Sequence, residues 1–233
     1  MNQHMPQSTM PDAPTSPFED AQQDTLPVTL LHSVAVRKRP KPGERRVQIL
    51  QTLAAMLEQP AGERVTTAAL AGRLQVSEAA LYRHFASKAQ MFEGLIDFIE
   101  QSVFTLANQI VEREQSQDAT TGARQSARII AMLVQFAEKN PGMARVMVGD
   151  ALVFENERLQ QRMNQFFDKI EATLKQCLRA GASPASLTPT VDAQVCASVL
   201  TAYAVGRLQR FVRSGFKRLP SEHLDASLAS MLG

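Results

Sequence analysis

The sequence contains little that would support redox, metal or phosphoryl-transfer chemistry. Among its 233 residues there is no tryptophan, and the two cysteines, Cys177 and Cys196, lie in apolar helical contexts. We expect these thiols to be buried and reduced rather than bridged or bound to a metal. The four histidines, at positions 4, 32, 84 and 223, show no metal-ligand spacing, and no glycine-rich phosphate loop or nucleophile motif is present. The sequence therefore predicts a protein that is not an enzyme and that uses no cofactor.

Long hydrophobic runs are also missing. No apolar stretch approaches the roughly 20 residues of a membrane span, and the N-terminus lacks the basic segment and apolar stretch of a secretory signal. Hydrophobic residues nevertheless make up 44% of the chain, which is enough for a core in one or two domains. We therefore expect a globular, cytoplasmic protein that needs no membrane.

Cations are absent from the first 36 residues, which instead carry four carboxylates and several prolines. This composition buries too little apolar surface to offset the entropy of ordering, so we expect residues 1–42 to form a disordered extension. The charge then reverses, because residues 37–46 carry six cations and one anion. Two interpretations of this basic run stay open: a solvated linker, or an arm that reaches DNA phosphates or the minor groove through Arg45 and Arg46.

From Gly43 onward the sequence has the period of α-helices. Thr66 and Ser77 can each cap a helix start, and Ser87 with Gln90 forms a capping box for a longer helix. Apolar residues recur at helical spacing in the later segments, and no strand-like alternation interrupts them. The sequence therefore predicts an all-α fold of about nine helices, whose later members cover about residues 88–114, 121–139, 141–149, 156–180, 190–213 and 221–231.

Residues 66–85 predict a helix-turn-helix, whose second helix enters the DNA major groove. On a helix over residues 78–85, Leu81 and Phe85 share the face that must be buried. The opposite face carries Ala79, which lets the backbone approach the bases, with Tyr82 and Arg83, which can bind phosphates or base edges. Each residue alone is equally consistent with a structural role. We expect further DNA contacts from the helix starts and flanks, at Thr66, Thr67, Ser77, His84 and Lys88.

The run from Val76 to Phe85, followed by Ser87, Lys88 and a long helix, resembles the TetR family of regulators. The resemblance implies a DNA-binding domain over residues 43–88 and a dimerising, partner- or ligand-binding body over residues 89–233. Gln75 occupies the turn position at which the family usually has glycine. A left-handed backbone there costs a residue with a side chain on the order of 1 kcal/mol.

Further motifs, including Asn140-Pro141-Gly142 and the run from Arg210 to Ser214, resemble one branch of that family, the nucleoid occlusion factors. The resemblance implies a nucleoid-associated dimer on palindromic double-stranded DNA, often with two dimers per site. It also implies that the bound dimer captures the C-terminal tail of the division protein FtsZ and antagonises its polymers. The tail would lie between the fourth and fifth helices, along Phe98, Met132, Gln135, Lys139 and Asn140.

Phe98 is unusual on physical grounds as well. At about 100° per residue it lies roughly 120° from the centre of the apolar stripe of its helix. A large aromatic side chain in that position is either packed against another helix or exposed for a partner. Residues near Ala197 and Ala202 are small, which favours a two-fold dimer interface on the eighth and last helices, although packing within one chain remains an alternative.

An alternative function is a TetR-type repressor that responds to a small ligand. Such a repressor needs a few buried polar groups among the apolar walls of a pocket in its body. The stripes of the fourth and seventh helices are nearly all apolar. The sequence therefore favours a packed body without a ligand.

Overall fold

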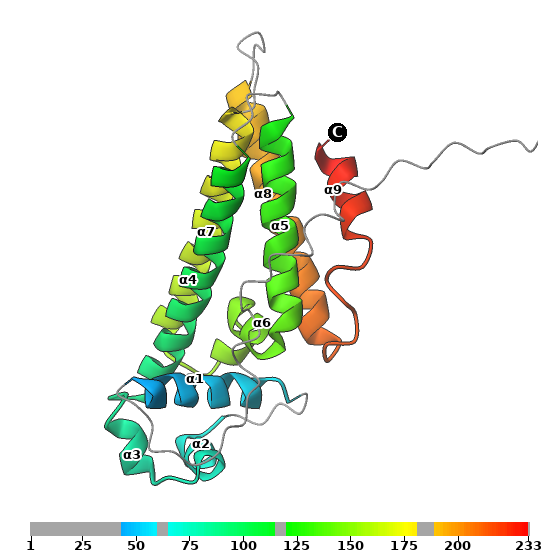
Figure 1. Ribbon diagram of the computed structural model, residues 1–233. Coiled ribbons are helices and arrows are strands. Elements are labelled where there is room, and N and C mark those ends of the chain that lie inside the picture. The colour runs from blue at the N-terminus through cyan, green and yellow to red at the C-terminus, as the bar shows by residue number, and fades with distance from the viewer. Residues whose placement is uncertain (1–42, 60–64, 115–119, 181–188, 233) are drawn as a thin grey trace, which may run out of the picture. The chain divides into compact units, whose positions relative to one another are not determined.

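The computed structural model describes residues 43–59, 65–114, 120–180 and 189–232, with the side chains of residues 189–192 left aside. Over these ranges the chain forms α-helices and one short 3₁₀ helix, without strands, as Figure 1 shows. The all-α expectation is confirmed. The predicted N-terminal extension lies outside the described residues.

The helices are α1 (Glu44–Leu57), α2 (Thr67–Leu74), α3 (Glu78–Tyr82), α4 (Lys88–Arg113), α5 (Thr121–Lys139), α6 (Pro141–Met147), η2 (Asp150–Leu152), α7 (Glu157–Ala180), α8 (Pro189–Arg213) and α9 (Leu224–Leu232).

Side-chain hydroxyls cap the starts of α2, α3 and α4. The hydroxyl of Thr66 accepts a hydrogen bond from the Ala69 N–H at 3.1 Å, and that of Ser77 accepts one from the Ala80 N–H at 3.3 Å. Ser87 caps α4 by accepting from the Gln90 N–H at 3.2 Å. Each cap satisfies a backbone donor that has no partner within its helix, so the predicted helix starts are confirmed.

Helices α4, α5, α7 and α8 form the body and lie side by side along their lengths (Figure 1). The Phe166 ring is fully buried at the centre of the body and meets the Phe104 and Phe167 rings edge-on, at centroid distances of 5.6 and 5.1 Å. Such edge-on pairs stabilise by about 0.5–1.5 kcal/mol each beyond the burial of area. None of the described helices combines the length and hydropathy needed to cross a membrane.

One arginine joins α7 to α4 at the surface of the body. The guanidinium of Arg162 donates to Asp97 at 2.6 Å and to Glu100 at 2.8 Å. Burial works to lower the pKa of Arg162, but the hydrogen bonds and charges of the two carboxylates raise it overall. This pair of contacts fixes which side of α4 faces α7.

Helices α1, α2 and α3 form a head beneath the body, and α1 joins the two. Ile49 and Leu53 of α1 are buried, and α1 contacts α2, α4 and α6. Leu81 and Phe85 are each only 1% exposed, which confirms the inward face predicted for the second helix of the helix-turn-helix.

Two helix boundaries differ from the prediction. The helix α3 ends at Tyr82 and not at Phe85, because the Ala86 N–H is bonded to the Gln90 side chain at 2.8 Å, so the chain leaves the helix to enter the α4 cap. The last helix begins at Leu224 and not at Ser221, after a left-handed residue at His223 with φ of 56°. Before this second boundary the Ser221 N–H donates to Glu138 of α5 at 3.3 Å, so a distant segment holds the chain there.

Candidate nucleic-acid interface

The turn between α2 and α3 has the left-handed residue that the sequence predicted. Gln75 has φ of 55° and ψ of 44°. Directly after it, the Val76 N–H donates to the Ala71 carbonyl at 3.0 Å, which closes the end of α2. The hydroxyl of Thr67 donates to a Glu78 carboxylate oxygen at 2.5 Å and joins the starts of the two helices. The relative orientation of α2 and α3 is therefore fixed at both ends of the turn.

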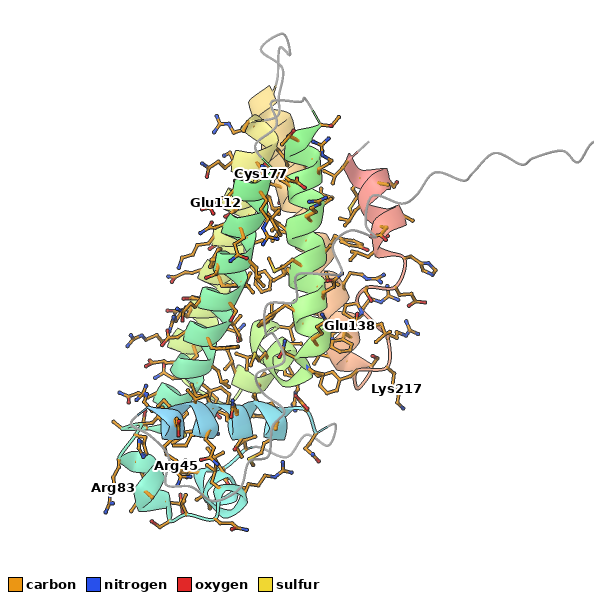
Figure 2. All side chains as sticks on the ribbon, in the orientation of Figure 1. Arg45, Arg83, Glu112, Glu138, Cys177 and Lys217 are labelled. Atoms are coloured by element: carbon orange, nitrogen blue, oxygen red, sulfur yellow. The ribbon has the colours of Figure 1, made fainter. Side chains whose placement is uncertain are left out.

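The outer face of α3 presents a small, an aromatic and a basic side chain to solvent. Ala79 and Arg83 are exposed, and Tyr82 is 46% exposed. Thr66 and Ser77, at the two capped helix starts, are exposed as well. A face of this kind can bring the backbone close to base edges, while a hydroxyl and a guanidinium reach bases or phosphates. Figure 2 shows Arg83 at the outer edge of the head.

The two arginines at the start of α1 differ in their surroundings. Arg46 donates to the carbonyl oxygen of His84, and its guanidinium lies 4.1 Å from the centre of the Phe85 ring. Its cation therefore supports the end of α3. Among the described residues Arg45 makes a local hydrogen bond, to Gln48 at 2.7 Å, and so is the better placed of the two for a phosphate. The side chain of His84 is half-buried.

Lys88 has a different environment from the one expected. Its ammonium forms an ion pair with Glu155 at 2.5 Å, and both side chains are largely buried. It also lies 5.6 Å from the centre of the Phe92 ring. A cation held in this way must give up a partly desolvated pair before it can bind a phosphate. The sequence offered no means to foresee this, because Glu155 lies 67 residues further along the chain.

A second exposed surface lies on α4 and α5. Phe98 is 39% exposed. At about 100° per residue it lies some 100° to 160° around α4 from Asp97 and Glu100, which face α7. Phe98 therefore lies on a side of α4 that is turned away from α7. Helix α5 also packs against α4, and Gln125 of α5 donates to the Glu114 carbonyl at 2.8 Å, at the end of α4. We call Phe98 of α4 together with Met132, Gln135 and Lys139 of α5 the α4–α5 seam.

The α5 residues expected beside Phe98 fall into two groups. Met132 is half-buried, whereas Gln135 and Lys139 are exposed. All three follow the α5 strip on which Arg128 pairs with Glu114 at the end of α4. Asn140 differs, because it is only 6% exposed and its amide donates to the Phe136 carbonyl at 2.8 Å. Its burial argues against a direct contact with a partner, since the side chain caps the C-terminal end of α5 from within.

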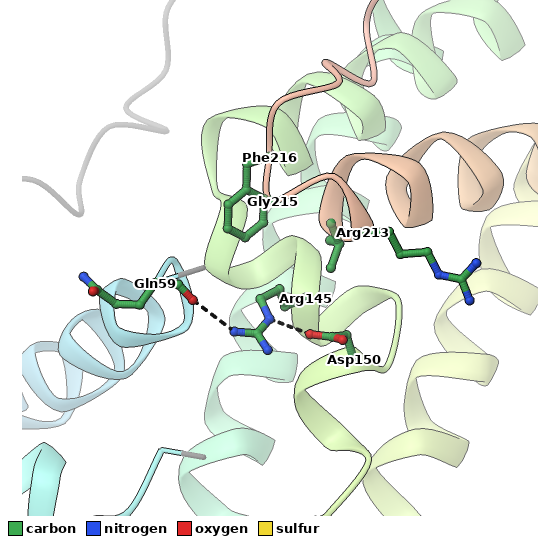
Figure 3. Close-up of a pocket in the computed structure, with 7 residues that line it drawn as sticks. Gln59, Arg145, Asp150, Arg213, Gly215 and Phe216 are labelled. Atoms are coloured by element: carbon green, nitrogen blue, oxygen red, sulfur yellow. Dashed lines mark hydrogen bonds and ion pairs between the residues drawn. The ribbon is translucent and has the colours of Figure 1, made fainter. Parts of the chain in front are cut away.

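A pocket of about 250 Å³ lies where the head, α6 and the end of α8 meet, and it was not predicted from the sequence. Figure 3 shows Arg145 at its centre, between Gln59 and Asp150. Arg145 donates to Asp150 at 2.5 Å and to the Leu57 carbonyl at 3.2 Å, which caps the C-terminal end of α1. The Arg145 charge is thus neutralised by Asp150, and the residue joins the body to the head.

The outward face of α8 is apolar and unusually exposed. Val195 is 58% exposed and Val199 is 49% exposed. Ala202 is also exposed, and no atom would approach a side chain added at Gly206 within 4 Å. A period of 3.6 residues places these positions on one strip, opposite the buried Ala197 and Ala204. Large exposed valines along such a strip are typical of a protein interface.

Comparison with known proteins agrees with this arrangement. Residues 49–95 match the bacterial regulatory proteins of the tetR family, and residues 121–232 match the SlmA-like tetracyclin repressor-like C-terminal domain. The nucleoid occlusion factor SlmA of Idiomarina loihiensis is 52% identical over 182 residues, covering 78% of this chain and 90% of that protein. SlmA of Alteromonas mediterranea is 46% identical over 190 residues, covering 82% and 95%.

Among solved structures, the transcriptional regulator FadR from Bacillus subtilis in complex with stearoyl-CoA has a TM-score of 0.61. The similarity covers 80% of this chain and 97% of that one, at 14% identity. At this identity the likeness extends to the fold alone. The chain therefore belongs to the SlmA family of nucleoid occlusion factors, DNA-binding regulators with the TetR-type fold and not enzymes.

Proposed function

We propose that this protein binds palindromic DNA on the nucleoid as a dimer and, from the DNA, captures the C-terminal tail of FtsZ and antagonises Z-ring assembly. The observation that supports this proposal most is the exposure of Phe98 on α4, the helix that follows the helix-turn-helix in the sequence. One side of the head is free for DNA, and the first half of α4 carries an aromatic side chain that the core does not use. These are the two surfaces that such a function needs.

On DNA, α3 lies in the major groove. Ala79 allows close approach, Tyr82 donates a hydrogen bond to a phosphate or stacks on a sugar, and Arg83 reads a base edge or binds a phosphate. The exposed caps Thr66 and Ser77 lie at helix starts, where backbone N–H groups favour phosphates. A palindromic site requires a two-fold dimer, and the exposed strip of α8 supplies a surface for it.

The α4–α5 seam takes the tail. Phe98 and Met132 accept its apolar side chains, while Lys139 attracts its acidic ones, and Gln135 lines the path between them. The mixture of an exposed aromatic side chain and a nearby cation suits a short peptide that carries both kinds of residue. Asn140 acts indirectly, by holding the turn from α5 into α6.

Fluorescence anisotropy with a labelled FtsZ tail peptide and a labelled palindromic duplex tests both surfaces in parallel. We expect Phe98→Ala to weaken peptide binding by about 30-fold, the loss typical of an aromatic hot spot, and to leave DNA affinity within about twofold. We expect Tyr82→Ala to do the reverse. Each variant should affect only one ligand, because the two side chains lie on different helices.

Phe154→Ala is the matched control, because Phe154 is 74% exposed on the loop before α7 and away from the seam. It should leave both affinities unchanged. Unaltered peptide binding in Phe98→Ala would reject the seam. Loss of DNA binding on addition of a small ligand, with no peptide binding in any variant, would instead support the ligand-responsive repressor.

A further inference from the structure

Four cations gather at the C-terminal end of α8 and in the turn that follows it. Arg210, Arg213, Lys217 and Arg218 are all exposed. Over the part of the chain that the structure describes, no carboxylate lies within ion-pair distance of any of them. Arg162 and Arg145 of the body, by contrast, each form an ion pair with a carboxylate. We call these four residues the α8-end cluster.

The backbone that presents the cluster is tightly held and strained. After α8 the chain turns through Gly215 and Phe216, with φ of 62° and 65°. A bulky residue such as Phe216 rarely adopts this left-handed conformation, which costs on the order of 1 kcal/mol or more. The Phe216 ring lies against the buried Phe211 ring at 5.2 Å, and the Ser214 hydroxyl accepts from the Lys217 and Arg218 N–H groups at 3.1 and 2.9 Å. The turn therefore fixes where Lys217 and Arg218 lie.

The cluster lies at the head end of the body. The pocket around Arg145 is lined by Gln59, directly after α1, and by Val212, Arg213 and Phe216 from the end of α8. Figure 3 shows the Arg213 side chain directed away from Arg145 and Asp150, so its charge is not used in that pocket. Figure 2 shows Lys217 at the outer edge of the same end of α8. Arg213, together with the turn that leads to Lys217, thus lies close to the end of α1, the helix that supports α2 and α3.

The cluster continues the strip of α8 that would form the dimer interface. Arg213 lies 18 residues, about five helical turns, after Val195 on the same outward strip. For two heads to bind one palindrome, the two-fold axis must point from the bodies toward the DNA. An α8 interface about that axis brings the clusters of both protomers together at the head end. Like charges at an interface repel one another and weaken association unless an anion neutralises them. The polyanion on this side of the dimer is the DNA that the heads bind.

We propose that the paired α8-end clusters bind the phosphates of the DNA segment between the two half-sites. This inference rests on the proposed DNA-bound dimer and adds a contact from the body to those of the heads. Phosphate contacts carry no base information, so the cluster adds affinity and salt dependence on any sequence that the heads accept. The turn holds the backbone of Lys217 and Arg218 in place before the DNA arrives, which reduces the backbone entropy lost on binding.

The test is the salt dependence of DNA binding by Arg213→Gln/Lys217→Gln, with Lys169→Gln/Lys175→Gln on α7 as a control of equal charge. The probe is a palindromic duplex that the wild-type protein selects from a random-sequence pool. We expect the slope of log K against log salt to fall in magnitude by about two to four for the first double variant, since each phosphate contact contributes about 0.9. The control variant should retain the wild-type slope.

A second duplex, with neutral methylphosphonates at the central positions, locates the contact. On this duplex we expect wild type and Arg213→Gln/Lys217→Gln to have the same slope. A slope equal to that of the control on the unmodified duplex would overturn the proposal. So would a deficit that persists on the neutralised duplex.

Two further outcomes separate this inference from its premises. If the wild-type protein selects no duplex, the proposed function fails and not the cluster alone. If the DNA slopes are unchanged but the double variant loses binding to a polyglutamate peptide, the cluster serves an acidic protein partner, and the DNA contact is rejected. Sedimentation and circular dichroism confirm that the variants remain folded dimers.

Discussion

At the scale of single residues, Gln75 adopts a left-handed backbone conformation in the turn of the helix-turn-helix. Its φ of 55° and ψ of 44° are those of the residue that ends a helix, a position usually held by glycine. The Cβ of any other residue approaches the neighbouring carbonyl there, which costs about 1 kcal/mol. The chain retains glutamine nonetheless, so part of its stability is lost at the turn that orients α3.

We therefore expect Gln75→Gly to raise the free energy of unfolding by about 0.5–1 kcal/mol, because it removes the Cβ conflict. Urea denaturation measures the change. Gln75→Ala is the comparison, since it removes the rest of the side chain but keeps the Cβ. If the alanine variant proves as stable as the glycine variant, backbone strain is not the cause.

At the scale of helices, the close approach of α6 to α1 joins the body to the head. A Cβ added at Gly142 would lie inside van der Waals distance of the Ala54 carbonyl oxygen, in the last turn of α1. One turn later on α6, Arg145 donates to the Leu57 carbonyl at the end of α1. The two contacts lie on the same face of α6, and together they set how α1 is held against the body.

Gly142→Ala should therefore destabilise the protein by about 1–3 kcal/mol, because the helices must separate to admit a methyl group. Gly72→Ala provides the opposite case, since nothing lies within 4 Å of a Cβ at that exposed position of α2. There we expect a gain of about 0.5–1 kcal/mol from helix propensity. Thermal unfolding of both variants checks the contrast. If both variants lost the same amount of stability, the close approach of α6 to α1 would not be the cause of the loss.

The sequence predicted helices well where local chemistry determines them. The caps at Thr66, Ser77 and Ser87, the left-handed turn and the buried face of α3 all depend on residues within a few positions of one another. The prediction failed at the end of α3 even though the contact that follows it, from the Ala86 N–H to the Gln90 side chain, spans only four residues. It failed at the start of α9 because Glu138, 83 residues earlier, accepts a hydrogen bond from the Ser221 N–H. For the same reason the Lys88–Glu155 pair and the burial of Asn140 could not be foreseen, because periodicity gives a face but not the neighbour that covers it.

At the scale of the whole molecule, the proposed function requires a dimer, and the exposed strip of α8 is the surface available for it. Val195 and Val199 are far more exposed than core valines such as Val103, which is fully buried. Burying such side chains against a second copy stabilises by about 25 cal/mol per Å² of apolar surface removed from water. The palindromic site and an interface on the apolar strip thus both require a two-fold symmetric dimer.

A charge on this strip should separate the protomers. We expect Val199→Glu to raise the dimer dissociation constant by at least about 30-fold, since an unpaired carboxylate would be buried in the interface. DNA affinity should fall with it, because two heads no longer bind together. Val153→Glu is the control, since Val153 is 68% exposed but lies at the end of η2, away from α8 in the sequence. Sedimentation velocity distinguishes the variants, and a dimeric Val199→Glu protein would place the interface elsewhere.

The Lys88–Glu155 pair and the packing of α6 against α1 also bear on how the protein can be engineered. One side of α1 is buried against the body, and Lys88 forms an ion pair with Glu155, which lies in the loop before α7. The helix-turn-helix therefore cannot be transferred as an independent unit. Transplanted onto a foreign scaffold, it would lose those partners and expose apolar surface at the graft. Retargeting to a new DNA sequence should therefore proceed by substitutions on the outer face of α3, in a chain that is otherwise left whole.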